Sequence, residues 1–232
     1  MGKPPPKKYL PRGIKILFED ADLIIIEKPV GMLSVPARYE PEKNALSLMT
    51  HFVRKGNLKS RKELFAVNRL DRETSGILVL AKSFAFREKL HEAWDEVEKN
   101  YLAVVEGSVD ADSGVIESWL VEDENYRVRS VPAPQENAGR TGRERFAATR
   151  YEVLKRASRW TSLSIFLLTG RKNQIRVHFS ENGHPLIGDK MYGRGNGPRL
   201  ALHARKFCFT HPRTRERIEI ESEVPEFFRK FL

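Results

Sequence analysis

Short apolar runs, each bounded by turn residues, dominate the hydrophobic pattern of this chain. Runs of about four to eight residues between turn formers are typical of buried strands. We predict strands over residues 14–18, 23–27, 64–67, 77–81, 101–106, 115–120, 126–131, 146–154, 161–168, 200–209 and 217–220. Because most of these strands follow one another without a helix between them, the pattern predicts an α+β fold with a large, mostly antiparallel mixed β-sheet flanked by helices and loops.

Helical spacing of apolar residues is confined to a few segments. Two of them follow a residue that can cap a helix, Asn44 and Ser83, and a third ends at Gly183. We predict helices over residues 45–55, 84–98, 173–181 and 223–232. The second helix has an apolar stripe that we expect to be buried, formed by Phe86, Leu90, Ala93, Trp94 and Val97.

The domain organisation follows from the segments that lack either pattern. Residues 1–12 contain a Pro-Pro-Pro run and four cationic side chains, and such a segment cannot form a packed element. We therefore predict a flexible basic tail over residues 1–12 and a single domain over residues 13–232. Residues 132–142 are rich in Pro, Gly and polar side chains, which predicts a mobile loop.

The charge balance of the chain favours a polyanionic partner. Its 232 residues carry a formal net charge of +10, which fits RNA, DNA or an anionic membrane. No apolar run approaches the ~18 residues that span a bilayer, and the N-terminus lacks the apolar stretch of a signal peptide. We therefore expect a cytoplasmic protein without a membrane partner. Cys208 is the only cysteine, so no internal disulfide and no thiolate metal cluster can form.

The candidate chemistry lies in a short loop between two predicted strands. Residues 68–76 read Asn-Arg-Leu-Asp-Arg-Glu-Thr-Ser-Gly and place Asp71 between Arg69 and Arg72. The arginines would keep the carboxylate ionised, and an ionised aspartate can act as a nucleophile or a base. The alternative is a turn carboxylate that only forms ion pairs with its neighbours.

Several other kinds of chemistry lack their motifs in this chain. There is no Gly-rich phosphate loop, and no pair of histidines has the spacing of a catalytic zinc site. Ser75 does not lie in the Gly-x-Ser-x-Gly turn of serine hydrolases. Asp71 and Glu73 share one loop, whereas glycosidase carboxylates flank the substrate about 5 to 9 Å apart.

Three further segments accompany the Asp71 loop. They are residues 99–107 (Lys-Asn-Tyr-Leu-Ala-Val-Val-Glu-Gly), 169–178 (Thr-Gly-Arg-Lys-Asn-Gln-Ile-Arg-Val-His) and 183–193 (Gly-His-Pro-Leu-Ile-Gly-Asp-Lys-Met-Tyr-Gly). Together with the loop, these segments resemble the RluA family of pseudouridine synthases, and the resemblance covers nearly the whole chain from Ile14 onward. It implies the pseudouridine synthase fold and an isomerase that converts uridine to pseudouridine in structured ribosomal or transfer RNA.

The resemblance also implies residue roles. Asp71 matches the catalytic aspartate, Tyr101 the tyrosine that packs on the base, and Arg176 the basic residue that pairs with the aspartate. Arg69 matches the arginine that fills the gap left by the flipped uridine. Flipping costs a few kcal/mol, which a cation beside the vacated stack and an aromatic pocket wall can offset. Further RNA contacts are expected from Arg72, Arg171 and Gln174.

The remaining expectations concern cofactors, assembly and departures from the family pattern. The family needs no metal or organic cofactor, and we expect a monomer limited to the catalytic domain, without an S4-type RNA-binding domain. Asn68 stands where the family usually has His, and Lys172-Asn173 where it usually has Thr-His. We expect these changes to affect RNA fit or local hydrogen bonds. Two alternatives stay open: a non-catalytic RNA-binding or RNA-folding module on the same scaffold, and a basic protein that binds DNA or membranes.

Overall fold

The chain forms two compact units in a computed structural model that describes residues 9–57, 59–133 and 143–232. Unit 1 runs up to Glu98 and includes residues 204–223, whereas unit 2 contains residues 99–203 and 224–232. Residues 1–8 of the predicted tail and 134–142 of the predicted loop lie outside the described residues. The tail over 1–12 and the single domain over 13–232 stay predictions.

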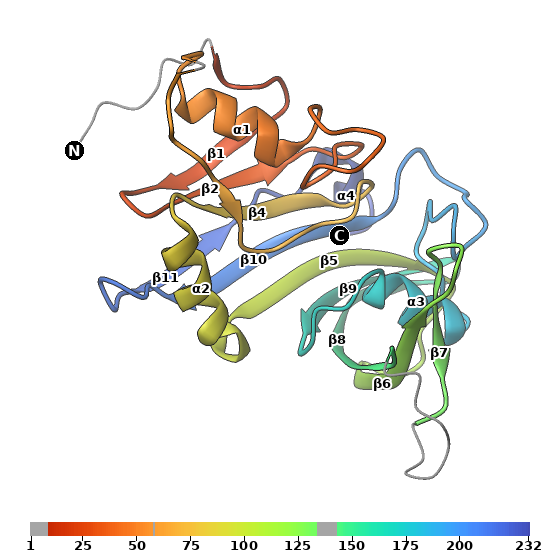
Figure 1. Cartoon of the computed structure of the whole chain (residues 1–232). Helices are drawn as coiled ribbons and strands as arrows, with labels where there is room; N and C mark the ends of the chain where they lie inside the picture. Colours follow the sequence, from red (N-terminus) through yellow and green to blue (C-terminus); the bar gives the residue numbers. More distant parts are fainter. Residues whose placement is uncertain (1–8, 58, 134–142) are drawn as a thin grey trace. The chain divides into compact units, whose positions relative to one another are not determined.

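The strands of unit 1 share one sheet, shown in red, orange, gold and blue in Figure 1. Its described strands are β1 (Lys15–Glu19), β2 (Leu23–Lys28), β3 (Phe65–Ala66), β4 (Ser75–Ala81), β10 (Leu202–Thr210) and β11 (Arg217–Glu221). The order is β1-β2-β4-β10, with β3 paired to β4 and β11 paired to β10. The β1–β2, β2–β4, β3–β4 and β10–β11 pairs are antiparallel.

Both faces of this sheet are covered. The two helices of unit 1 are α1 (Ala45–Val53) and α2 (Phe84–Glu92). Ile24 and Ile26 belong to the apolar cluster of α1, whereas Leu23 and Ile25 belong to the cluster of α2. Successive residues of a strand point to opposite faces, so a strand between two helices must be apolar at every position. This explains why residues 23–26 are an unbroken apolar run.

The predicted helix over residues 84–98 is wrong in its second half, because α2 ends at Glu92. Ala93 leaves helical geometry with φ −98° and ψ 21°, and a short 3-10 turn follows over Trp94–Glu96. Val97 is already extended, with φ −81° and ψ 117°. The side chains of Trp94 and Val97 still reach the apolar cluster of Phe86 and Leu90. Because a turn carries these two side chains back to the same core, their spacing in the sequence resembles that of a buried helical stripe.

The predicted helix over residues 223–232 is also too long. The observed helix α4 covers only Glu226–Arg229 and begins after Pro225, which has ψ 146°. A residue before proline is driven out of the helical region, so residues 223–224 are excluded from the helix. The apolar side chains of Phe228 and Phe231 pack against Leu102 and Val104 of unit 2.

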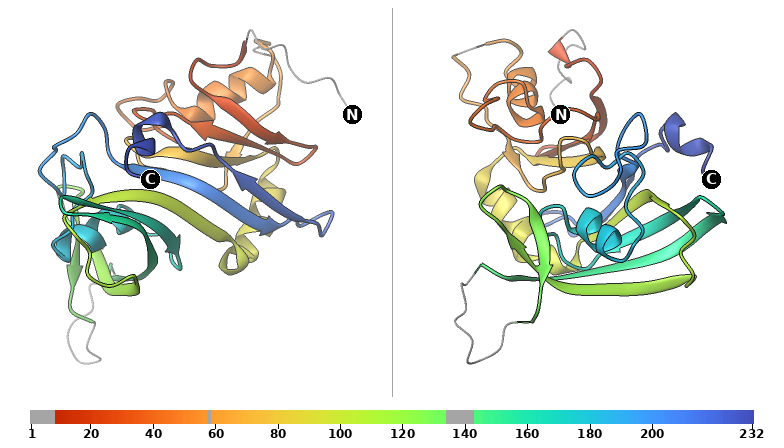
Figure 2. Two further views of the ribbon diagram at one scale, coloured as in Figure 1. Left: turned by 180° about the vertical axis from the view of Figure 1, so that it is seen from behind. Right: turned by 90° about the vertical axis from the view of Figure 1, so that its right-hand side faces the viewer.

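Unit 2 is built on five antiparallel strands, coloured green to teal in Figures 1 and 2. They are β5 (Glu98–Glu106), β6 (Ser113–Glu122), β7 (Val128–Val131), β8 (Arg145–Ala157) and β9 (Trp160–Leu167). Their order is β5-β9-β8-β6-β7, and every neighbouring pair is antiparallel. The helix α3 (Gln174–Glu181) lies against β6, β7 and β8.

The predicted fold class is therefore confirmed. Each predicted strand has a counterpart within a few residues, and the described strand pairs are antiparallel. Tyr126 is the main boundary difference, because its φ of +61° places it in the turn before β7 rather than in the strand. Among the described residues, no helix is long and apolar enough to cross a membrane.

Candidate active site

The backbone of Leu70, directly before Asp71, is fixed by one buried side chain. The Leu70 N–H donates to Ser34 Oγ at 2.9 Å, and Ser34 Oγ donates to the Leu70 carbonyl at 2.7 Å. Ser34 is 3% exposed, so these bonds are shielded from water. Both backbone polar groups of the residue before the candidate catalytic carboxylate are therefore held by unit 1.

The residue after Asp71 is fastened as well. The Arg72 carbonyl accepts from the Gly31 N–H at 2.8 Å, and Arg72 Nε donates back to the Gly31 carbonyl at 3.0 Å. The Arg72 guanidinium also pairs with Glu40 at 2.9 Å. Arg72 thus joins the Asp71 loop to the segment after β2, a structural function beside the RNA contact predicted for it.

Lys28 supplies a second attachment for the same carbonyl. Its side chain is fully buried, and Nζ donates to the carbonyls of Met32 (2.7 Å), Pro29 (3.0 Å) and Arg72 (3.3 Å). A buried ammonium is tolerated only when its protons are satisfied, and these carbonyls provide that compensation. The sequence did not identify Lys28 or Ser34 as site residues, since neither belongs to a catalytic pattern.

Asn68 closes the entrance of the loop. Its Nδ2 donates to the Ile77 carbonyl at 3.2 Å, and its Oδ1 accepts from the Val79 N–H at 2.8 Å. The Val67 N–H donates to the Val79 carbonyl at 2.9 Å. The Asn68 amide therefore extends the strand-like bonding of residue 67 by one step along β4. Asn68 therefore has a local hydrogen-bonding role in unit 1.

The charged side chains of the loop differ in exposure. Asp71 is half-buried, whereas Arg69 and Arg72 are exposed. At the end of the loop, Gly76 has φ +115°, and a Cβ there would lie 2.2 Å from the Ala204 carbonyl oxygen. Only glycine fits at this point, which holds the loop close to β10.

Arg176, on helix α3 of unit 2, is buried and forms a two-pronged ion pair with Asp189. Nε donates to Oδ2 and Nη2 donates to Oδ1, both at 2.8 Å. Arg176 is 8% exposed and Asp189 is 1% exposed. Burial raises the pKa of Asp189, but hydrogen bonds and charge from Arg176, with the N–H groups of Tyr192 and Met191, outweigh burial and lower it. The carboxylate is therefore the ionised form that the arginine requires.

Asn173 and Tyr192 enclose the same guanidinium. Arg176 Nη1 donates to Asn173 Oδ1 at 3.1 Å, and Asn173 Nδ2 donates to the Tyr192 hydroxyl, also at 3.1 Å. The Tyr192 ring centre lies 5.1 Å from Arg176 Cζ, within the range of a cation–π contact. The departure at Asn173 is therefore a local hydrogen-bonding change beside Arg176.

Gln174 is 2% exposed and fastens the start of α3 to β8. Its Nε2 donates to the Ala148 carbonyl at 3.0 Å and to Thr149 Oγ1 at 2.8 Å. Its Oε1 accepts from Thr169 Oγ1 at 2.7 Å and from the Arg171 N–H at 2.9 Å. These bonds give Gln174 an internal role, and its predicted RNA contact stays a prediction.

The other predicted residues of unit 2 differ in their surroundings. Arg171 is exposed, and its Nε donates to the Phe146 carbonyl at 2.9 Å. Lys172 is exposed and forms an ion pair with Glu122. Tyr101 is 9% exposed on β5, opposite Ile165 of β9.

The predicted site residues divide between the two units. Unit 1 contains Arg69, Asp71 and Arg72, and unit 2 contains Tyr101, Arg171, Gln174 and Arg176. Within unit 1 the structure brings the three residues together on one fastened loop. Within unit 2, Gln174 and Arg176 lie in the first turn of α3, and Arg171 lies three residues before the helix begins. The catalytic and RNA-contact roles of these residues stay predictions.

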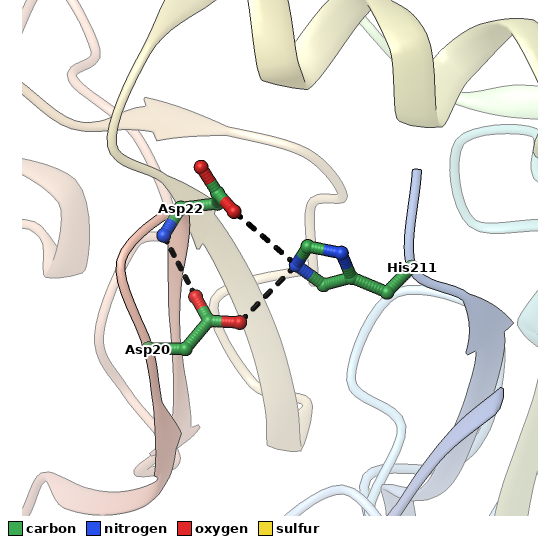
Figure 3. A group of neighbouring side chains, drawn as sticks. All are labelled: Asp20, Asp22 and His211. Atoms are coloured by element: carbon green, nitrogen blue, oxygen red, sulfur yellow. Dashed lines mark hydrogen bonds and ion pairs between the residues drawn. The ribbon is translucent and has the colours of Figure 1, made fainter. Parts of the chain in front are cut away.

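One further cluster of unit 1, Asp20, Asp22 and His211, has the composition of a metal site (Figure 3). Backbone N–H groups of Arg213 and Thr214 donate to His211 Nδ1 at 3.2 and 3.1 Å. Nε2 therefore carries the ring proton, 3.1 Å from Asp20 Oδ2 and 3.5 Å from Asp22 Oδ2. A metal-bound histidine normally donates the N–H of its other nitrogen, which two donors at Nδ1 prevent. The cluster fits a link between two turns.

Known proteins resemble this chain over most of its length. The RNA pseudouridylate synthase family model matches residues 22–181. The dual-specificity RNA pseudouridine synthase RluA of Escherichia coli is 35% identical over 85% of this chain and 87% of its own length. The uncharacterized RNA pseudouridine synthase YlyB of Bacillus subtilis is 34% identical over 93% of this chain and 71% of its own. The ribosomal large subunit pseudouridine synthase D of Nitrosomonas europaea is 33% identical over 92% of this chain and 62% of its own.

A solved structure shows the same fold. The human RNA pseudouridylate synthase domain containing 4 matches with a TM-score of 0.72 and 23% identity, over 92% of this chain and 89% of that one. The sequence relatives and the family match extend the likeness from fold to activity. This chain therefore belongs to the RNA pseudouridylate synthase family and, like its RluA-type relatives, is an isomerase that acts on RNA.

Proposed function

We propose that Asp71 is the reacting carboxylate of this pseudouridine synthase, with Tyr101 against the uracil ring and Arg176 as its cationic partner. The reaction breaks the bond between C1′ and N1 of a uridine and forms a bond between C1′ and C5. The proton that leaves C5 passes to solvent and N1 gains one, so the reaction is an isomerisation. It needs no oxidant, reductant or cofactor.

The observation that carries this proposal is the fastening of the Asp71 loop. Ser34 holds the residue before Asp71, and Lys28 with Gly31 holds the residue after it. A reacting group gains most when its scaffold fixes it before the substrate arrives. A turn that served only to connect β3 and β4 would not require a buried lysine and a buried serine from another segment to hold the residues on either side of Asp71.

Arg69 fits the proposed role in base flipping. Its side chain is exposed, and it stands two residues before Asp71 on the same loop. A uridine must leave its stack to reach the carboxylate, and a cation that enters the vacated space offsets part of that cost. Arg72 and Arg171 are also exposed and are proposed to contact the RNA.

The substrate class is proposed to be structured ribosomal or transfer RNA. The net charge of +10 suits a polyanion, and one relative is named for the ribosomal large subunit. We further propose a cytoplasmic monomer, which light scattering and cell fractionation would test. Pseudouridine maps of a deletion strain and its parent would identify the modified uridine.

The test of Asp71 uses RNA that carries tritium at C5 of uridine, because each turnover releases one tritium to water. We expect Asp71→Asn to abolish release while binding RNA with near wild-type affinity. Glu73→Gln is the matched control, since it neutralises an exposed carboxylate two residues further along the loop. Near wild-type release by Asp71→Asn would refute its assignment. RNA binding without release by the wild-type protein would instead favour the non-catalytic module.

A further inference from the structure

We propose that Asp189 and Asn173 are positioning residues that fix the orientation of the Arg176 guanidinium for the reaction. The inference rests on the proposed role of Arg176. Both residues act through the arginine and not through a contact with the RNA. Asp189, Asn173 and Tyr192 form what we call the arginine frame. It holds Arg176 through two hydrogen bonds to the Asp189 carboxylate, one to Asn173 Oδ1 and one contact with the Tyr192 ring.

The Asp189 carboxylate is itself held in place before it receives the arginine. Its Oδ1 accepts from the backbone N–H groups of Met191 and Tyr192, both at 2.9 Å. Its own carbonyl accepts from the N–H groups of Gly193 (3.2 Å) and Gly195 (3.0 Å). The turn after Asp189 is therefore folded around this residue, and the carboxylate has little freedom to turn away.

Gly188, the residue before Asp189, lies where two backbone segments approach each other closely. Gly188 has φ +75°, and a Cβ at that position would lie 1.9 Å from the Arg199 carbonyl oxygen. Such a close approach of two backbone segments fixes where Asp189 begins. The backbone thus sets the position of the carboxylate, and the carboxylate sets the position of the guanidinium.

Two parallel hydrogen bonds to a carboxylate fix the plane of a guanidinium, which a single ion pair does not. Asn173 adds a third constraint in that plane, and the Tyr192 ring adds contact with Arg176. Asn173 has the unusual φ of +53° for a residue other than glycine, and its amide joins Arg176 to Tyr192. We infer that this frame keeps Arg176 in one orientation, so that turnover does not wait for a flexible side chain to align.

A purely structural function is the competing explanation, because the same ion pair also attaches α3 to the turn at residues 189–192. Ser180 distinguishes the two. It lies on α3, and its Oγ donates to the Tyr192 carbonyl, so it attaches the helix to the same turn without contacting the guanidinium. Ser180→Ala should therefore weaken the attachment and leave Arg176 aligned.

The experiment measures the single-turnover rate of tritium release with saturating enzyme, together with RNA affinity and melting temperature. Asp189→Asn keeps an oxygen for the turn but loses one acceptor and the charge of the pair. We expect its rate to fall about 100-fold with near wild-type RNA affinity, because small misplacements of reacting groups cost about that much. The rate of Asn173→Ala should fall by a smaller factor, about 10-fold, because this variant keeps the ion pair between Arg176 and Asp189. Ser180→Ala should lower the melting temperature with an unchanged rate.

A double variant tests whether Asp189 acts through the arginine. Arg176→Lys cannot form the two-pronged pair, so adding Asp189→Asn to it should cost little more, whereas independent effects would multiply. Wild-type rates in both Asp189→Asn and Asn173→Ala, or multiplied losses in the double variant, would overturn the proposal. If Asp189→Asn does not fold, a wild-type rate in Asn173→Ala is enough to overturn the proposal that these contacts position Arg176. Absence of release by the wild-type protein would contradict the proposed function instead.

Discussion

His178 makes the stability of this protein depend on pH in a window that can be stated in advance. It lies on α3, two residues after Arg176, and is 1% exposed. Its Nδ1 is 2.9 Å from Thr149 Oγ1 and its Nε2 is 3.0 Å from Ser118 Oγ. Burial lowers the pKa of His178 from 6.5 to about 4, although the charge of Glu181 raises it in part. The folded protein therefore prefers the neutral ring.

The sign and size of the effect follow from proton linkage. Between pH 6.5 and about 4 the unfolded chain binds a proton at His178 that the folded chain refuses, so stability falls as pH falls. At 1.36 kcal/mol per pKa unit, the full loss is about 3 kcal/mol, and about 2 kcal/mol of it is reached by pH 5. Below about pH 4 the folded protein also binds the proton, and this contribution stops changing.

The matched variant is His178→Gln, which cannot titrate and whose amide can still reach Ser118. Urea unfolding, followed by tryptophan fluorescence at pH 7.5, 6, 5 and 4, gives the free energy of unfolding of each protein. At pH 7.5 we expect the variant to be less stable by about 1 kcal/mol, because one hydrogen bond is lost. Its disadvantage should disappear near pH 6 and reverse at lower pH. Parallel pH curves for the two proteins would refute the reasoning, since other groups titrate alike in both.

Two further variants test the attachments of the Asp71 loop. Asn68→Ala removes both bonds to β4 and should cost about 1–3 kcal/mol in urea unfolding, whereas Asn68→His should keep most of that stability. A cost as large for the histidine as for the alanine would count against the pairing role. Lys28→Met removes the lysine donor from the carbonyls of Pro29, Met32 and Arg72, and only the Arg72 carbonyl keeps the Gly31 N–H described above. We therefore expect a similar loss of stability and a slower single-turnover rate of tritium release. An unchanged rate in Lys28→Met would show that loop position does not limit the reaction.

The periodic parts of the chain were predictable because their burial is periodic. Residues 23–26 are apolar at every position and lie between α1 and α2, so the sequence identified β2 within one residue. The end of α2 was missed because Trp94 and Val97 return to the same core through a turn. Apolar spacing records which side chains are buried, and it does not record the backbone path that buries them.

The candidate site was predictable only in part, for a physical reason. Asp71 and its neighbouring arginines could be identified from the sequence, because their charges lie together in one short loop. The residues that hold the loop and the arginine could not be identified in this way. Ser34, Lys28 and Asp189 act through contacts with segments that are distant in the sequence. A lysine after a strand is ordinarily exposed, and nothing local indicates that Lys28 binds three carbonyls. The function of such residues can be identified only from the tertiary structure, which shows the distant groups that they bind.

Asn68 and Asn173, which the resemblance to the RluA family places where histidines are usual, have a common explanation in hydrogen-bonding capacity. Asn68 uses one donor and one acceptor toward β4, and a neutral imidazole also offers one donor and one acceptor. Asn173 likewise accepts from Arg176 and donates to Tyr192, a pair of duties that a neutral histidine can also perform. A histidine gains charge near neutral pH, and it would then lose its acceptor. An asparagine keeps both functions at every pH, so the hydrogen bonds of Asn68 and Asn173 do not change with acid. Protonation of His178, in contrast, destabilises the folded protein as pH falls.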